Sequence, residues 1–309
     1  MTRTDSSLTV VEGDMEPRVA IVTGAGAGLG RAEALALART GASIVVNDFD
    51  DAVEAAKSVL DEIEAEGGRA VLVTGDVGER ATADALVQAA VEHFGGLHVV
   101  VNNAGVLRDR MLFSMSDEEW DTVIRVHLRG HFLLSRNATA LWRRQSKETG
   151  KPVCARIVNT ASEAFLVGSA GQPNYAAAKA GIVALTVATA RGAARYGVRA
   201  NAICPRARTA MTAEVFGDAP AEGADPLSVE HVAPLVAFLA SEQAERINGQ
   251  VFVVHGGMVA LLKPPALERR FDTGGPLWTP DELETTVGAY FDDRDPDTMF
   301  AATEILELP

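Results

Sequence analysis

A tyrosine and a lysine stand one helical turn apart in an Ala-rich stretch from Pro173 to about Tyr196. Three alanines separate Tyr175 from Lys179, and residues four apart lie on one face of a helix. A free phenol ionises at about pH 10, and a neighbouring cation stabilises the phenolate and lowers its pKa. The pair predicts an acid/base group that exchanges a proton with an alcohol or ketone during hydride transfer.

A serine with suitable chemistry precedes this pair. Ser162 lies thirteen residues before Tyr175, just past the apolar run Arg156–Asn159. Its hydroxyl could hydrogen-bond the carbonyl or alkoxide oxygen of a substrate and hold that oxygen beside the phenol. A Tyr and a Lys at this spacing are common on ordinary helices, so the catalytic interpretation depends on the serine and on a cofactor site.

A glycine-rich loop predicts that cofactor site. Residues 23–30 read TGAGAGLG, between an apolar run and a helical stretch. Glycines at 24, 28 and 30 allow a sharp turn, and they let backbone N–H groups approach a pyrophosphate at the start of the helix, near Leu29. The alternative is a tight strand-to-helix turn without a ligand.

An acidic residue indicates which dinucleotide would bind. Asp48 follows Gly30 by eighteen residues and ends the second apolar run. A carboxylate there accepts hydrogen bonds from the adenosine ribose hydroxyls and repels a 2′-phosphate. No Lys or Arg lies in the glycine loop or in residues 47–51. The sequence therefore predicts NAD rather than NADP.

Apolar runs alternate with helical stretches along the first 205 residues and predict an α/β protein. Continuous apolar runs are typical of parallel strands covered on both faces. Together they predict one doubly wound, mostly parallel seven-stranded Rossmann sheet with helices on both faces and ligands at the carboxyl ends of the strands. The expected strands are Arg18–Thr23, Ser43–Asp48, Ala70–Thr74, His98–Asn102, Arg156–Asn159, Val198–Ile203 and Val251–Val254, and helices are expected at Leu29–Thr40, Ala52–Glu66 and Thr82–Phe94.

The two ends of the chain differ from this repeating unit. Residues 1–16 are polar and acidic and are expected to be a flexible lead-in to a catalytic domain over 17–262. Residues 263–309 are rich in Pro, Gly and acidic side chains. They predict a C-terminal extension, too short for an independent core, that packs on the body or on a neighbouring subunit. One short helix is expected from Pro280.

Composition excludes several kinds of partner. The net charge of −14 disfavours nucleic acids and anionic membranes, and no apolar run is long enough to span a bilayer. No Cys/His cluster suggests a metal site. The two cysteines, Cys154 and Cys204, are expected to be reduced core thiols of a cytoplasmic protein.

Four motifs in order resemble the short-chain dehydrogenase/reductase family. They are TGAGAGLG, the Asn102–Gly105 run NNAG, Ser162, and Tyr175 with Lys179. The resemblance covers about residues 17–260 and implies a homodimer or homotetramer with Tyr175 as acid/base. It implies that Lys179 binds the nicotinamide ribose and that Ser162 orients the substrate. It further implies cofactor contacts by Asp76, Val77, Asn103, Ala104, Gly105 and the segment from Pro205 to Thr209.

Two positions depart from the family pattern. His127 stands where many members carry an Asn on the central helix. It could support a proton relay through water, or it could pack and cap an irregular helix, and the sequence leaves both roles open. Arg206 stands where a Gly usually follows Pro205 and puts a positive charge near the site.

The substrate is suggested by a closer resemblance. The stretches WDTVIRVHLRGHFLL, PRARTAMT and LWTPDEL are similar to the 3-hydroxyacyl-CoA dehydrogenase unit of peroxisomal multifunctional enzymes and its stand-alone bacterial relatives. This implies a 3-hydroxyacyl-CoA, or a hydroxysteroid or steroid-derived thioester. Apolar residues, Met211, Val215 and Phe216, follow the sixth strand, where the resemblance implies a substrate lid. The insertion there, Glu214 to Ser228, is rich in Ala, Gly and Pro, and the apolar residues suggest a bulky apolar substrate.

The sequence supports three further hypotheses. Arg206, Arg208 or the Lys263–Arg270 region could contact CoA phosphates, although surface cations often serve only solvation or ion pairing. An NADPH-dependent 3-ketoacyl reductase is the alternative enzyme, and Asp48 argues against it. A non-catalytic NAD-sensing protein is the alternative outside enzymes, and the presence of Tyr175 and Lys179 argues against that.

Overall fold

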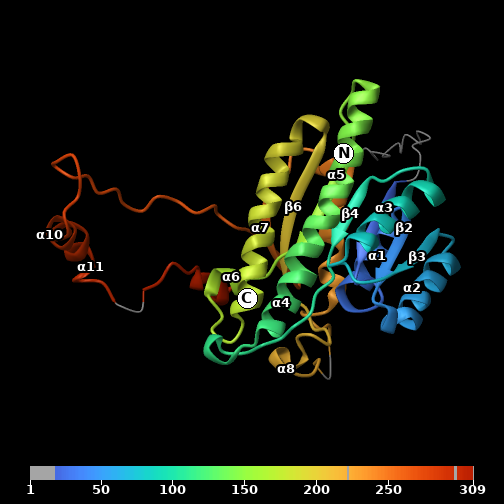
Figure 1. Ribbon diagram of the computed structural model, residues 1–309. Coiled ribbons are helices and arrows are strands. Elements are labelled where there is room, and N and C mark those ends of the chain that lie inside the picture. Colours follow the sequence, from blue (N-terminus) through green and yellow to red (C-terminus); the bar gives the residue numbers. More distant parts are fainter. Residues whose placement is uncertain (1–17, 221–222, 296–297, 309) are drawn as a thin grey trace, which may run out of the picture.

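The computed structural model describes residues 18–220, 223–295 and 298–308; the expected lead-in, residues 1–16, lies outside these ranges. An eight-stranded sheet of order β3-β2-β1-β4-β5-β6-β7-β8 runs through the body (Figure 1). The strands are β1 (Val19–Thr23), β2 (Ser43–Asp48), β3 (Ala70–Thr74), β4 (Val99–Asn102), β5 (Ala155–Thr160), β6 (Val198–Pro205), β7 (Val251–His255) and β8 (Met258–Leu261).

The predicted fold class is confirmed, but the expected number of strands is wrong. All neighbouring strands pair in parallel except β7 and β8, which pair antiparallel. His255 pairs with Met258, so only Gly256, with φ of +50°, and Gly257 connect the two strands. A two-glycine turn between strand-like runs is a hairpin signal, and it explains the eighth strand.

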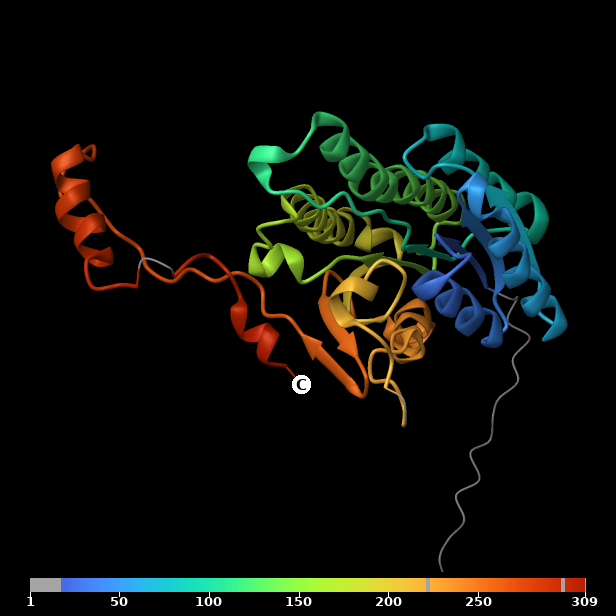
Figure 2. The same ribbon diagram turned by 90° about the horizontal axis from the view of Figure 1, so that it is seen from below.

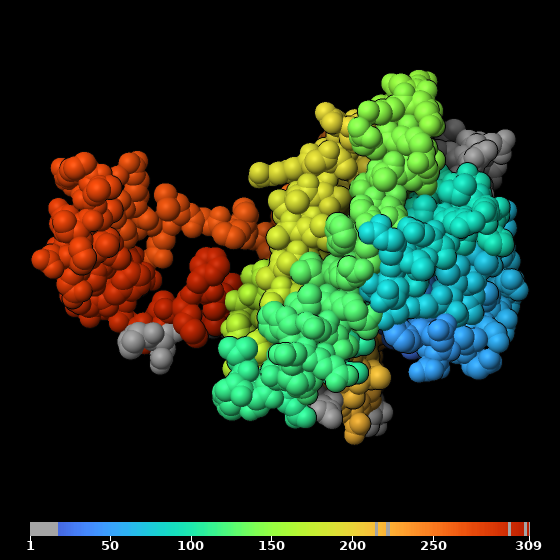
Figure 3. Space-filling view, in the orientation of Figure 1, coloured from blue at the N-terminus to red at the C-terminus, as the bar shows by residue number. Residues whose placement is uncertain are grey.

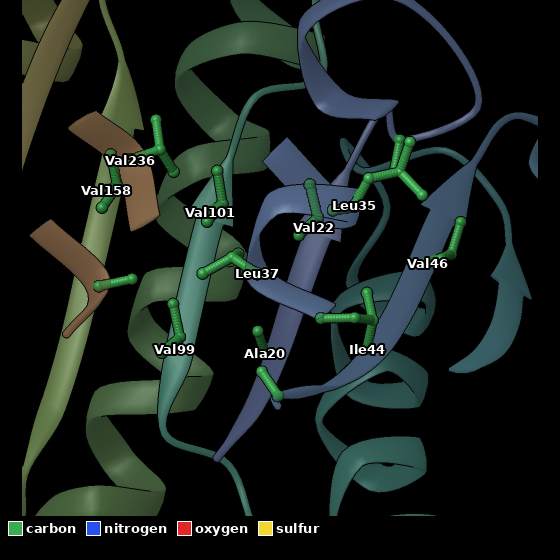
Figure 4. Packing of buried hydrophobic residues seen from close by; sticks show 14 of the residues in the cluster. Ala20, Val22, Leu35, Leu37, Ile44, Val46, Val99, Val101, Val158 and Val236 are labelled. Carbon is green, nitrogen blue, oxygen red and sulfur yellow. The ribbon is translucent and has the colours of Figure 1, made fainter. Parts of the chain in front are cut away.

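Helices cover both faces of the sheet, as expected. Alternate residues of β1 face opposite ways: Ala20 and Val22 pack in one apolar cluster, and Val19 and Ile21 pack in another. Figure 4 shows Leu35, Leu37 and Val236 meeting the strand residues of the first cluster. The main helices are α1 (Gly28–Arg39), α2 (Val53–Ala65), α3 (Arg80–Phe94), α4 (Asp117–Ile124), α5 (Gly130–Thr149), α7 (Pro173–Ala193) and α9 (Ala233–Ala240).

Shorter helical pieces complete the fold. A π-helical turn, Arg125–Arg129, joins α4 to α5. Four short α-helices are α6 (Ala164–Val167), α8 (Ala213–Phe216), α10 (Pro280–Leu283) and α11 (Ala289–Phe291), and a second π-helical turn, Glu284–Gly288, joins α10 to α11. The short helix expected from Pro280 is present, and Thr279 and Glu282 form a capping box at its start.

The C-terminal extension leaves the body and then returns to it. After β8 the chain runs out into an arm that carries α10 and α11 away from the sheet (Figures 1 and 2). The space-filling view shows this arm standing clear of the body, while the last residues lie closer to it (Figure 3). The returning segment forms a 3-10 helix at Thr303–Glu307, and Ile305 is buried. We call Ala302–Leu308 the returning segment.

Among the described residues, no helix combines the length and the apolar character that a bilayer span requires.

Candidate active site

The predicted site residues gather at one edge of the sheet. Thr23, Asp48, Asn102, Thr160 and Pro205 are the last residues of β1, β2, β4, β5 and β6. These strands pair in parallel, so their carboxyl ends meet at the same edge, where open α/β sheets bind ligands. The glycine loop and the NNAG run follow two of these ends directly, and Ser162 lies two residues past a third.

The glycine loop forms a cradle that side chains would fill. Gly24 and Gly28 have φ of +63° and +54°, in the region that favours glycine. A Cβ on Gly30 would lie 2.2 Å from the Gly24 carbonyl oxygen, and one on Gly28 would lie 3.4 Å from Thr209 Cγ2. Leu29 packs against the core between them. The loop therefore fits the close approach of a pyrophosphate, with Thr209 beside it.

Asp48 is tied to the glycine loop. Its Oδ2 accepts a hydrogen bond from Gly26 N at 2.7 Å, and its Oδ1 accepts one from Phe49 N at 2.8 Å. These contacts hold the carboxylate at the end of β2, beside the loop. The negative charge is therefore fixed beside the glycine loop, where the adenosine ribose is expected.

Two arginines that sequence reasoning missed bind Asp76 and Gly78, on either side of Val77. Asp76 forms an ion pair with Arg125 and accepts from Gly78 N at 2.8 Å. Arg129 Nε donates to Gly78 O at 2.8 Å. Both arginines come from the π-helical turn, about fifty residues further along the chain, and neither spacing nor residue type signalled this contact.

The NNAG run is anchored to the first strand. The Thr23 hydroxyl accepts from the backbone N–H groups of Asn103 at 3.0 Å and Ala104 at 3.1 Å. Asn103 Nδ2 donates to Thr23 O at 2.9 Å. These bonds fix the segment that the resemblance assigns to the cofactor cleft.

His127 packs behind this run. A Cβ on Gly105 would lie 2.3 Å from His127 Cε1, so only glycine fits there. His127 Nε2 lies 3.0 Å from Val106 N and 2.8 Å from Val106 O. Burial, and then the nearby Lys179, lower the pKa of His127 well below 6.5. The imidazole is therefore neutral at physiological pH.

The structure brings Tyr175, Lys179 and Ser162 together. Lys179 Nζ lies 5.2 Å from the centroid of the Tyr175 ring and donates to Thr160 O at 2.6 Å. The Ser162 side chain lies close enough to the phenol to lower the pKa of Tyr175. Lys179 is buried, with 1% of its surface exposed. The three side chains thus lie together beside the end of β5, largely shielded from solvent.

The pKa of the phenol differs from the expectation. Burial raises the pKa of Tyr175 to about 12, and the nearby Ser162 side chain opposes this rise. Burial also lowers the pKa of Lys179 to about 7. An amine that is only partly protonated at neutral pH gives the phenolate less support. The expected lowering of the Tyr175 pKa is therefore wrong for this structure.

The arginines expected to contact CoA phosphates are engaged within the protein. Arg206 pairs with Glu163 through two hydrogen bonds of 2.7 and 2.8 Å. Arg208 Nε binds Asp225 at 3.0 Å, and its Nη1 donates to Phe216 O at 2.6 Å. For these two arginines the structure favours ion pairing within the protein over contacts to CoA phosphates. The Lys263–Arg270 region follows β8, at the start of the arm (Figure 2).

Comparisons with known proteins identify the family of the whole chain. Residues 18–219 match the family model for short chain dehydrogenases. The chain is 60% identical over 301 residues to hydroxyacyl-CoA dehydrogenase ChsB1 of Mycobacterium tuberculosis, covering 95% of this chain and 94% of that protein. It is 41% identical over 253 residues to the peroxisomal multifunctional enzyme type 2 of Mus musculus, covering 80% of this chain but 32% of that protein.

A solved structure is similar throughout. A short chain dehydrogenase from Mycobacterium avium superposes with a TM-score of 0.81 at 44% identity, covering 94% of this chain and all of that one. This protein belongs to the short-chain dehydrogenase family. It is an oxidoreductase of the kind that uses a nicotinamide cofactor, and it resembles the 3-hydroxyacyl-CoA dehydrogenase branch.

Proposed function

We propose that this protein is an NAD-dependent dehydrogenase of 3-hydroxyacyl-CoA thioesters, including those with a bulky steroid-derived acyl group. The observation that carries the proposal is the 60% identity to a hydroxyacyl-CoA dehydrogenase across 95% of the chain. The lid segment after β6 is rich in Ala, Gly and Pro and begins with apolar side chains, which suits a large apolar acyl group.

The proposed roles follow from the contacts. Ser162 holds the reacting oxygen of the substrate beside the phenol, and Tyr175 exchanges the proton of that oxygen. NAD, when bound, supplies the hydride acceptor. Lys179, fixed by Thr160 O, binds the cofactor ribose. The glycine loop and the N-terminus of α1 take the pyrophosphate.

The preference for NAD is supported by Asp48. Its carboxylate is fixed beside the glycine loop by Gly26 N, and a 2′-phosphate there would meet a negative charge. An NADPH-dependent 3-ketoacyl reductase remains the alternative enzyme. Initial rates with NAD and NADP, on the same hydroxyacyl-CoA, separate the two, and a preference for NADP would overturn the NAD proposal.

One screen tests the function as a whole. Hydroxyacyl-CoA thioesters and free hydroxysteroids are offered with NAD, and NADH formation is measured. We expect turnover with the thioesters and a fall of about 10²- to 10⁴-fold in Tyr175→Phe, the usual contribution of an acid/base group. Tyr196→Phe, at the far end of the same helical stretch, is the matched control. Full turnover by Tyr175→Phe would favour a non-catalytic role for Tyr175, Lys179 and Ser162.

We further propose that the protein is a cytoplasmic homodimer or homotetramer in which the arm lies on a neighbouring subunit. Leu267, Leu277 and Phe300 are 81%, 80% and 96% exposed, and apolar side chains of this size favour a covered position. Leu277→Glu should shift the sedimentation coefficient toward the monomer. An unchanged value would leave the arm without this role. Both cysteines are free thiols, in keeping with a reducing compartment.

A further inference from the structure

Arg206 is saturated with acceptors from three distant parts of the chain. A guanidinium has five N–H donors. Glu163 takes two of them, one from Nε and one from Nη2. Nη1 donates to His255 Nε2 at 3.2 Å and to Leu308 O at 3.1 Å. The remaining Nη2 donor binds Ile305 O.

This network is largely shielded from solvent. The side chains of Arg206 and Glu163 are each 14% exposed. Burial, and then the positive charge of Arg206, lower the pKa of His255, which keeps its imidazole neutral and able to accept. A charge taken out of water needs nearly complete hydrogen bonding, and the returning segment supplies two of the acceptors that make it complete.

The network joins the residues on either side of the reacting centre. Glu163 is bonded through the chain to Ser162, and Arg206 to Pro205, at the end of β6. Ser162 Oγ in turn accepts from Ala164 N at 3.2 Å, in the first turn of α6. The ion pair therefore connects the substrate-orienting serine to the segment that follows β6.

The returning segment also contacts α6, the short helix that begins two residues after Ser162. Ala302 N donates to Leu166 O at 2.9 Å, and Leu166 belongs to α6. Ile305 is 6% exposed, and Leu308 packs against a core cluster that contains Cys204 and Ile182. The segment is therefore docked by apolar contacts and by backbone hydrogen bonds, independently of the arm that precedes it.

We propose that the returning segment is a positioning element for Ser162, acting through Arg206 and Glu163. The proposal rests on the proposed function, since it assigns the segment a role in that reaction. Without the carbonyls of Ile305 and Leu308, Arg206 would lose two partners and could turn away from Glu163. The serine hydroxyl would then sample orientations that do not meet the substrate oxygen.

Two variants test this in the full-length enzyme. Ile305→Asp places a charge in the apolar contact and undocks the segment. We expect kcat to fall about tenfold or more, because small misplacements of a positioned group cost up to about 10²-fold. The Kd for NAD, measured by calorimetry, should change less than about twofold. Glu304→Gln, an exposed neighbour, is the control and should retain the kcat of the unmodified protein.

Hydrogen exchange supplies a readout that does not depend on turnover. In Ile305→Asp, the amides of residues 163–167 should exchange faster along with those of 302–308. If the segment undocks while 163–167 keep their protection and kcat is retained, the proposal is overturned. If the protein does not oxidise hydroxyacyl-CoA at all, the proposed function fails, and the exchange result still decides whether the segment orders residues 163–167.

Glu163→Gln breaks the same connection from the other side. It keeps the shape and one acceptor oxygen but removes the charge. We expect a lower kcat, and the double variant Ile305→Asp/Glu163→Gln should be no slower than the slower single variant, because both changes break one pathway. Independent effects that multiply in the double variant would contradict the proposal.

Discussion

The ring of His127 packs edge-on against the ring of Tyr175, with centroids 5.2 Å apart and an interplanar angle of 88°. Its Nε2 is held at the backbone of Val106, and its Nδ1 is buried with no hydrogen-bond partner among the described residues. These contacts favour the packing role over the proton relay. His127 packs against the ring of Tyr175 and also contacts Gly105 and Val106 at the end of the NNAG run.

His127→Phe should separate the two roles. Phenylalanine keeps an aromatic edge but loses the bond to Val106, so we expect kcat to fall by about tenfold, the effect of one buried hydrogen bond. The limbs of the pH profile should be the same before and after the change, because burial already keeps the imidazole neutral. His93→Phe, exposed on α3, serves as control. A limb near pH 6.5 that is present in the unmodified protein and absent in His127→Phe would instead support the proton-relay role of His127.

The raised pKa of Tyr175 sets the direction of the pH dependence. With the pKa at about 12, the phenol is protonated at neutral pH, which suits proton donation to a ketone. Oxidation needs the phenolate, so its kcat/KM should rise with pH through the alkaline range, whereas that for reduction should not. Since kcat/KM reports the free enzyme, a plateau for oxidation already reached at pH 7 would contradict the raised value.

Asp48→Asn should change the preference between the cofactors. Asparagine keeps an oxygen that can accept from Gly26 N and removes the charge that repels a 2′-phosphate. We expect kcat/KM for NAD to fall about tenfold, the effect of one hydrogen bond to a charged group, and that for NADP to rise. Asp51→Asn, exposed nearby, should leave both values unchanged. Equal changes with both cofactors would show that Asp48 does not discriminate.

Glu33 should make stability depend on pH. It is fully buried on α1, neither oxygen has a hydrogen-bond partner among the described residues, and burial raises its pKa from 4.5 to about 8. Between these values the folded state binds more protons than the unfolded state, so stability falls as pH rises from about 4.5 to 8 and then levels. The loss is at most about 1.4 kcal/mol per pH unit.

Glu33→Gln removes this titration. Its melting temperature should exceed that of the unmodified protein by an amount that grows between pH 5 and 8, because glutamine carries no charge to bury. Glu64→Gln, exposed on α2, is the control. A difference that does not vary with pH would show that Glu33 is solvated or paired in the folded protein.

An ion pair between Arg208 and Asp225 joins the two ends of the segment that follows β6. The hydrogen bond with Arg208 is the main cause that lowers the pKa of Asp225. Asp225→Asn should loosen this segment and speed its cleavage by protease several-fold, with kcat on a short thioester retained. Asp218→Asn, exposed in the same segment, should not change the cleavage rate. Equal cleavage rates in Asp225→Asn and Asp218→Asn would show that the Arg208–Asp225 ion pair does not hold the segment.

Sequence patterns predicted the positions of seven strands because each contains a short run of mostly apolar residues. β1 is buried at every residue, and such runs stand out. Met258–Leu261 alternates between half-buried and exposed residues at the sheet edge, which gave a weaker signal. The two glycines before it could have revealed the hairpin.

The site was predictable where residues close in sequence or family motifs carry it. Tyr175, Lys179 and Ser162 meet as expected. Arg206 and Glu163 are 43 residues apart, and the carbonyls of Ile305 and Leu308 lie further still, so no local pattern joins them. The burial of Glu33 was equally hidden, since helix periodicity places a residue on a face but does not show what covers it.

Both ends of the arm are fastened to the body, at β8 and at the returning segment. The stretch between them is therefore a long loop with both ends attached to the body, not a free C-terminal tail. The entropic cost of closing such a loop rises only slowly with the number of residues in it. Residues can be added to or removed from the tip, altering whatever the arm touches, while the fastening beside the serine keeps its geometry.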